Sequence, residues 1–444
     1  MQSTQEKKIV ITLSLYANLG HVLSAVKPTL IGDISLRMVD LSLSNGLVPS
    51  SPFGFAYFGG VLLANGSVKE GCRLGRLALK LVEMNDMSMH RSAIIAVVYF
   101  AILGLVEPFQ ITRDACCLGR KVGQQTGDFL YTTLNWIAHV HSSYLAGDCL
   151  DNVWTNCQDF IMRMQRQHAP HFIGGTLLLY YQTCVLREGL SVLNVKTPNN
   201  MPTEKEALQL FTMHPDVSNN SKVYQLERAY LFRQELGDVS VDMRTNIDHD
   251  PRQSNIFLYG TFYRGLASYL IARQTGEVDK RKEWIEAGDN VLAIIKYWSE
   301  HSSWNWKSKE VLLEAEKVYT VGTSEQASLF YEKAIRLAHK HKFINDEAIA
   351  SELAGVFFCE RGLDDMKAKA FLLHSVQCYK TWGALAVGKR VETYIASKYG
   401  SHCALQQPNS ALLASIFGPD EDSSISKKRQ VELCQSQGMF NGRV

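Results

Sequence analysis

Two histidines and two aspartates come closest to a metal-binding motif in this chain of 444 residues. His168 and His171 are separated by Ala-Pro, and the proline prevents the helical i, i+4 geometry that would aim both imidazoles at one ion. Asp364 and Asp365 are adjacent, but Lys369 stands where the third aspartate of an aspartate-rich motif would fall. We therefore predict that the histidines bind no metal and that the aspartates lie in a solvated turn.

Three glycines, Gly119, Gly123 and Gly127, are spaced four residues apart, as in loops that cradle phosphates. The lysine that would reach the phosphates is missing, so we predict that these glycines end one helix and begin another. The kinase motifs H-R-D and D-F-G, the zinc motif H-E-x2-H and the nucleophile motif G-x-S-x-G are absent from the sequence. The sequence therefore predicts a protein that is not an enzyme, with no catalytic residue, cofactor or bound metal.

The composition is that of an ordinary globular protein. Apolar residues make up 46% and charged residues 20%, the net charge is +2 and the pI is about 8.0. A charge balance this close to neutral does not favour nucleic acid as a partner, and the tyrosines and phenylalanines recur at helical spacing, which is typical of core packing.

The ten cysteines are scattered and form no C-x2-C pair, which indicates free thiols in a reducing compartment. The first residues are polar and charged, unlike a signal peptide. The longest apolar run, Ala93 to Val106, has 14 residues, whereas about 20 are needed to span a bilayer. We expect a cytoplasmic protein that does not insert into a membrane, and a buried helix over this run.

The sequence predicts pairs of helices as the elements that would position any functional residue. Ala327-x3-Tyr331-x2-Ala334 places small, large and small residues on one helix face, so that a neighbouring backbone can approach beside the ring. This is the spacing of the second helix of a tetratricopeptide repeat. No run long enough for a sheet is present. The sequence predicts an all-α fold, an α-α superhelix of tetratricopeptide-like helix pairs.

Small residues twelve positions apart predict where paired helices touch. Gly59 and Gly71 form one such pair, Ala315 and Ala327 another, and Ala138 is twelve residues before Leu150. The other predicted structural positions are Trp154, Cys157, Ala267, Leu353, Ala354, Phe357, Tyr379, Trp382 and Gly383. We expect Trp154 and Trp382 to be buried, and Leu36, Val39 and Leu43 to share one face of an early helix.

Composition changes divide the chain into four predicted parts. Helical repeats over 1–190 are followed by a connection rich in proline and asparagine over 191–222, with a short helix from Thr203 that begins with the capping pair Thr203-x2-Glu206. A second block of repeats spans 223–404. Residues 405–444 are polar and predicted to be disordered.

Several blocks in this order resemble the tetratricopeptide-like helical region of large signalling proteins that also contain a protein-kinase-like domain, an AAA-type ATPase, a GAF domain and a histidine kinase. The blocks are Gly71–Leu81, Gly127-Asp128 with Tyr131–Ala146, Trp304–Glu316, Tyr331–Ile335, Phe343–Ala354 and Tyr379–Ala384. Together they cover roughly residues 12–400. Val387 departs from the resemblance, because we expect a lysine there.

The resemblance implies a fold and a signalling context, and it carries over no catalytic residue. We expect a non-catalytic scaffold or regulatory arm that binds a protein partner, such as an ATPase or kinase chain acting in trans. One alternative is a fragment of a multi-domain histidine kinase or ATPase whose catalytic domains lie outside this chain. A self-contained helical enzyme with an unrecognised site is the other alternative.

Overall fold

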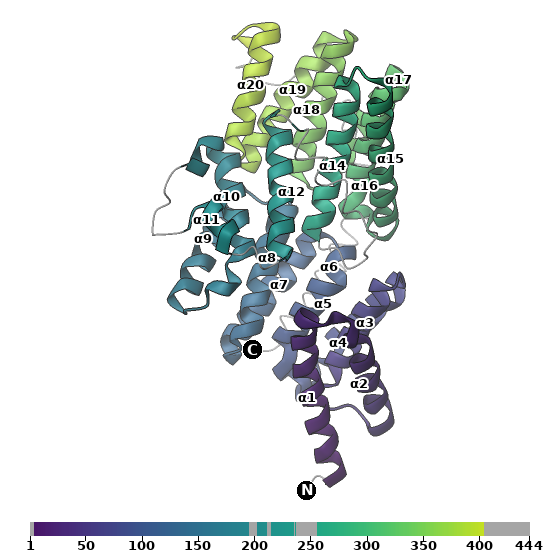
Figure 1. The fold of residues 1–444 in the computed structure, drawn as a ribbon, viewed down its shortest axis with the longest axis vertical. Helices are drawn as coiled ribbons and strands as arrows, with labels where there is room; N and C mark the ends of the chain where they lie inside the picture. The colour runs from purple at the N-terminus through teal and green to yellow at the C-terminus, as the bar shows by residue number, and fades with distance from the viewer. Residues whose placement is uncertain (1–3, 195–201, 211–214, 235, 237–254, 404–444) are drawn as a thin grey trace.

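Helices paired with their neighbours wind into a superhelix in the computed structural model (Figure 1). The structure describes residues 4–194, 202–210, 215–234, 236 and 255–403. Throughout these ranges there is no strand, so the all-α prediction is confirmed. None of the helices in them combines the length and the apolar character that crossing a membrane requires.

The first half of the superhelix begins with α1 and α2 at one end of the molecule (Figure 1). Its helices are α1 (Thr4–Val26), α2 (Ile31–Asn45), α3 (Ser51–Ala64), α4 (Val68–Leu81), α5 (Arg91–Ala101), α6 (Leu103–Val106), α7 (Phe109–Thr126), α8 (Phe129–Leu145), α9 (Leu150–Arg166) and α10 (Gly174–Glu188).

The second half continues to the opposite end, where α17 and α20 lie (Figure 1). Its helices are α11 (Glu204–Leu210), α12 (Pro215–Leu231), α14 (Asn255–Gln274), α15 (Val278–His301), α16 (Ser303–Val321), α17 (Ser324–Lys340), α18 (Ile344–Arg361), α19 (Asp365–Trp382) and α20 (Leu385–Tyr399).

The helix ends follow the local chemistry of the sequence. Gly66 and Gly127 have φ values of 83° and 73°, which a residue with a side chain rarely adopts, and each follows the end of a helix. Asp128 then starts α8 by accepting a hydrogen bond from the Tyr131 amide at 3.1 Å. Thr203 and Glu206 form the predicted capping box, in which the Thr203 amide donates to the Glu206 carboxylate at 2.7 Å.

The prediction about the three glycines was wrong for two of them. Gly119 and Gly123 lie inside α7, where α8 packs so closely that a Cβ on Gly119 would stand 2.4 Å from the Asn135 side chain. Of the three, only Gly127 ends a helix. In α2, serines and Met38 form the face against α3, and Leu36 and Leu43 on the predicted shared face are exposed.

Close backbone contacts join the helices of a pair. At the α3–α4 contact, a Cβ on Gly71 would lie 2.6 Å from the Gly59 carbonyl oxygen, so the two positions predicted to touch do so. At the α18–α19 contact, a Cβ on Gly355 would lie 3.0 Å from the Ala368 carbonyl oxygen. α7 pairs with α8 and α9 with α10, which differs from the predicted pairing of α8 with α9.

The two halves share one hydrophobic core, and Asn305 of α16 links them directly. Its side-chain oxygen accepts from the Phe109 amide at 3.1 Å, and its nitrogen donates to the Glu107 carbonyl at 2.8 Å. The Phe109 ring packs edge-on against Trp306 and Phe343. The start of α7 is therefore completed by residues of the second half. The tail prediction for 405–444 lies outside the described residues.

Candidate functional site

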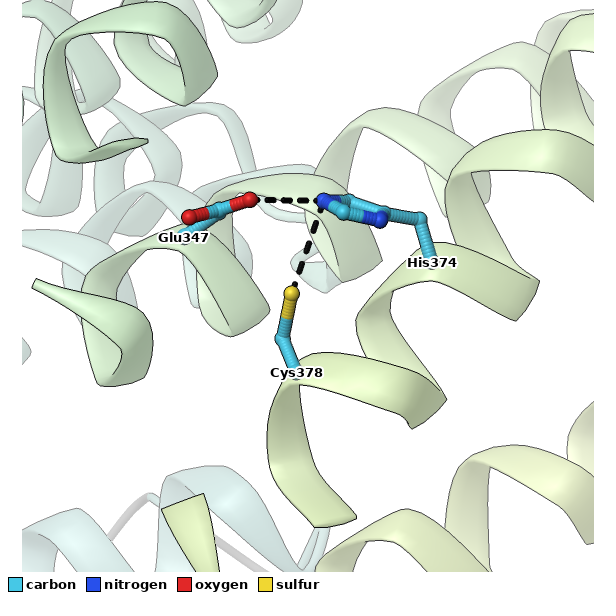
Figure 2. A group of neighbouring side chains, drawn as sticks. All are labelled: Glu347, His374 and Cys378. Atoms are coloured by element: carbon cyan, nitrogen blue, oxygen red, sulfur yellow. Dashed lines mark hydrogen bonds and ion pairs between the residues drawn. The ribbon is translucent and has the colours of Figure 1, made fainter. Parts of the chain in front are cut away.

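Three side chains with different donor atoms converge between α18 and α19: the Glu347 carboxylate, the His374 imidazole and the Cys378 thiol. Nε2 of His374 lies 2.7 Å from a carboxylate oxygen of Glu347 and 3.4 Å from Sγ of Cys378. One donor atom from each residue lies within 4.8 Å of the other two. Figure 2 shows that the carboxylate and the thiol reach the same imidazole nitrogen. This convergence makes the cluster the candidate site.

The two helices hold these side chains by simple spacing. His374 and Cys378 are one turn apart on α19 and therefore lie on one face. Glu347 lies in the first turn of α18, opposite that face. The close contact of Gly355 with Ala368 fixes the distance between the helices. All three site residues have little exposed surface, so packing restricts the positions of their side chains.

His339 of α17 supports the cluster from its exposed side. Its Nδ1 lies 3.2 Å and 3.1 Å from the two carboxylate oxygens of Glu347, and 59% of its side chain is exposed. Burial opposes ionisation of Glu347, but hydrogen bonds from His339 and His374 outweigh it and leave the carboxyl pKa lowered. Glu347 is therefore a carboxylate at neutral pH.

The pKa of the Cys378 thiol is shifted in the opposite direction to that of Glu347, so the thiol stays protonated. Burial raises its pKa far above the usual range, and the neighbouring Glu347 charge raises the pKa further. A nucleophilic cysteine needs a lowered pKa. In a catalytic triad, the carboxylate of the third residue binds the imidazole nitrogen that does not face the thiol. Here both groups face Nε2. The arrangement therefore does not fit a Cys-His-Glu catalytic triad and fits convergent ligands around one point.

Two other buried carboxylates are paired with positive charges from neighbouring parts of the chain. Glu352 of α18 accepts from Arg390 at 2.6 Å, from Arg233 at 2.5 Å and from the Tyr379 hydroxyl at 2.9 Å. Lys309 of α16 pairs with Asp346 at 2.5 Å. These contacts pair opposite charges and join helices, which is what structural ion pairs do.

Glu227 of α12 differs, because neutral groups surround its carboxylate. Tyr144 and Tyr259 donate to one oxygen at 2.8 Å and 3.3 Å, and Gln182 donates to the other at 2.9 Å. Burial raises the Glu227 pKa to about 7 in spite of these hydrogen bonds. The group joins α8, α10, α12 and α14 at the junction of the two halves, and it is closed to solvent.

Nearly all positions predicted to be structural are buried: Gly59, Gly71, Ala138, Cys157, Ala267, Ala315, Ala327, Tyr331, Ala334, Leu353, Ala354, Phe357, Tyr379, Trp382 and Gly383. Trp154 is only partly buried, so its prediction needs correction. α9 packs on α10, where the indole stacks on Tyr180 with Arg187 over its ring. The helix thus leaves one edge of this tryptophan in solvent.

The histidine and aspartate motifs both lie at helix ends. His168 and His171 are exposed around the turn after α9, and Asp364 caps α19 by accepting from the Lys367 amide at 3.0 Å. The described cysteines are all free, and five of the nine are buried.

Sequence reasoning missed the cluster of Glu347, His374 and Cys378. Glu347 is 27 residues from His374, and only packing of two helices joins them. The signal available in the sequence was His374-x3-Cys378, a pair of potential ligands at helical spacing.

Comparisons with protein-family models, curated proteins and solved structures each returned no match. The function of this chain must therefore be inferred from its own residues and their geometry.

Proposed function

We propose that this chain is a non-catalytic helical scaffold in signal transduction that binds another protein through the outer face of α1. The observation that supports this is an apolar stripe on that helix. Its side chains recur every three or four residues, and their exposed fractions lie between 43% and 76%: Ile11, Leu15, Leu19, Val22 and Val26. We call these residues the α1 stripe.

The opposite face of α1 is already packed. Leu13 and Ala17 are buried, Gly20 lies against the ring of Tyr57 in α3, and the Tyr57 hydroxyl donates to the Ala17 carbonyl at 3.1 Å. A helix that is apolar on both faces is normally buried on both. Covering the stripe would bury five side chains at about 1.5–3 kcal/mol for each one fully removed from water. The exposed face is therefore suited to a partner.

The chemistry of the stripe defines the occupant as an amphipathic helix of a partner protein. Between Ile11 and Val26 the sequence has no Asp, Glu, Lys or Arg, so the matching face must be apolar and uncharged. The spacing from Leu15 through Leu19 and Val22 to Val26 is four, three and four residues, as in the contact seam of paired helices. A partner helix there would continue the stacking of α1 on α2 and α3.

The resemblance of the sequence to signalling proteins suggests the class of partner, an ATPase or kinase chain acting in trans. The test uses the purified full chain as bait and compares it with a double variant, Leu15→Glu with Val22→Glu. Leu329→Glu is the matched control, because Leu329 is 68% exposed on α17, away from the stripe. ATPase or kinase chains that are captured are then purified and titrated against each bait by calorimetry.

The wild type and the control should bind the purified partner equally. The double variant should bind about a hundredfold more weakly, because two apolar contacts are replaced by charges. Its melting temperature should match the wild type, since both sites are exposed. The proposal fails if no captured ATPase or kinase chain depends on the stripe, or if sedimentation shows that only a second copy of this chain covers it.

A further inference from the structure

We propose that Glu347, His374 and Cys378 bind a divalent transition-metal ion, with zinc as the ion that fits best. This inference concerns a separate place from the α1 stripe and does not depend on a protein partner. The three residues offer oxygen, nitrogen and sulfur donors that point to a common centre (Figure 2). Side chains of these kinds are the ligands of zinc in proteins.

One of the donor separations already suits a tetrahedral ion, and a second needs a small shift. Zinc ligands lie about 2.0–2.3 Å from the metal, so neighbouring donors in a tetrahedron are separated by about 3.3–3.7 Å. Nε2 of His374 and Sγ of Cys378 are 3.4 Å apart, which already falls in this range. The carboxylate oxygen of Glu347 is 2.7 Å from Nε2 and must move outward by about half an ångström. A rotation of the carboxylate is enough for that shift.

The donor set also selects the ion. A thiolate with an imidazole favours zinc and related transition metals over magnesium or calcium, which prefer oxygen ligands. One carboxylate and one thiolate neutralise a divalent cation, so the buried site carries no net charge when it is filled. Coordination releases the thiol proton of Cys378 to solvent, and the proton that Nε2 of His374 donates to Glu347 in the metal-free protein moves to Nδ1.

His339 would act as a positioning residue beside the ion. Its Nδ1 is within 3.2 Å of both carboxylate oxygens of Glu347, and a hydrogen bond there would orient this ligand. Its exposed side chain marks the side on which solvent reaches the cluster, so an ion would enter there. The fourth coordination position then belongs to water. Filling the site would connect α18 and α19 through a metal in addition to their packing.

The experiment titrates the full chain, first treated with a chelator, with cobalt(II) as a spectroscopic probe for zinc. We expect one equivalent to bind, with the visible bands of tetrahedral cobalt and a thiolate-to-cobalt charge-transfer band in the near ultraviolet. Zinc should displace the cobalt. Cys378→Ser should remove the charge-transfer band, whereas Cys359→Ser, which changes a partly buried thiol of α18 outside the cluster, should keep it.

Two further variants separate a metal site from a structural role. Glu347→Gln should weaken cobalt binding at least tenfold, and His339→Ala should weaken it about 10- to 100-fold while keeping the charge-transfer band. Zinc at a hundredfold excess over its Kd should raise the melting temperature of the wild type by about 3 °C and leave Cys378→Ser unchanged. Circular dichroism at the start of each titration verifies folding.

The proposal is overturned by any of three results. These are no cobalt binding at 100 μM metal, binding without a thiolate band, or a band that survives in folded Cys378→Ser.

Discussion

The contacts α3–α4 and α18–α19 use the same backbone approach and differ in what surrounds it. Gly59 and Gly71 bring α3 and α4 together among apolar side chains. Gly355 and Ala368 do the same for α18 and α19, but α18 also carries two buried carboxylates before this contact, Glu347 and Glu352. The first contact depends on shape alone, whereas the second also depends on charge.

This difference shows that one helix-pair geometry can be stabilised in two ways. In the second half of the chain, tyrosines at predicted repeat positions reach a carboxylate on the preceding helix. Tyr331 donates to Glu316, and Tyr379 donates to Glu352. Arg273 supplies the balancing charge for Glu316 at 2.6 Å. We therefore expect mutations in the two halves to differ in size and in pH dependence.

The largest effect is expected for Trp382→Ala. The indole is fully buried and packs near Tyr144 of α8, with ring centroids 6.0 Å apart, so its loss leaves a cavity between the halves. The free energy of unfolding should fall by about 4 kcal/mol in urea denaturation. Trp154→Ala should cost clearly less, because that indole is partly in solvent. A melting temperature for Trp382→Ala within two degrees of the wild type would contradict the close packing of this indole.

Glu352→Ala should have the second-largest effect and lower the free energy of unfolding by about 3 kcal/mol, because it leaves Arg390 and Arg233 without their shared carboxylate. Burial disfavours the charge of Glu352, but Arg390 and then Arg233 lower its pKa from 4.5 to about 2. Its contribution is therefore present above about pH 4.5 and is lost as the pH falls toward 2. For Glu352→Gln, the free energy of unfolding measured by denaturation should not show this decrease between pH 5 and 3. If the variant shows the same decrease as the wild type, other groups cause the acid sensitivity.

Gly71→Ala tests the apolar contact. The added Cβ would stand 2.6 Å from the Gly59 carbonyl, so α3 and α4 must separate, at a cost of about 2 kcal/mol. The loss should be the same at pH 5 and pH 8, because the contact involves no titrating group. Gly60→Ala is the matched control, since its Cβ would meet only Ala101 at 3.9 Å. Equal melting temperatures for the two variants would refute the close approach.

Glu227→Gln should, unlike the other variants, stabilise the protein. The Glu227 pKa is raised from 4.5 to about 7, so the stability associated with its neutral form is present below pH 4.5 and is lost as the pH rises through 7. At pH 8 the glutamine variant should be more stable than the wild type, and the difference should shrink as the pH falls to 4.5. A flip of the Gln182 amide accommodates the new donor. Denaturation at both pH values gives the answer, and a variant that is less stable at pH 8 would show that the carboxylate is needed there.

Local sequence patterns were enough to predict the fold and many helix ends. Lys27-Pro28, Asn65-Gly66 and Gly127-Asp128 separate helices, because proline, glycine and capping residues act on their own neighbours. The pair Gly59 and Gly71 was also predictable, since a short turn leaves few ways for two helices to meet.

The candidate site was not predictable, for a physical reason. Periodicity shows that a residue lies on an apolar face, but it does not show which distant helix covers that face. Glu227 and Glu347 have partners 83 and 27 residues away. From the sequence alone, a glutamate beside an apolar face is interpreted as a solvent-exposed residue at the edge of that face, because its distant partner is not known. The partial burial of Trp154 was missed for the same reason.

The link between Asn305 and the start of α7 has a consequence for biosynthesis. The Phe109 amide is made 196 residues before the side chain that accepts from it. At about 5–20 residues per second, a ribosome needs roughly 10–40 s to close that gap. During that interval the Phe109 amide lacks its acceptor on Asn305, and the ring of Phe109 lacks its cover from Trp306 and Phe343. The nascent first half therefore exposes an apolar ring and a backbone amide at the start of α7. Chaperones are suited to cover this surface until the second half is synthesised.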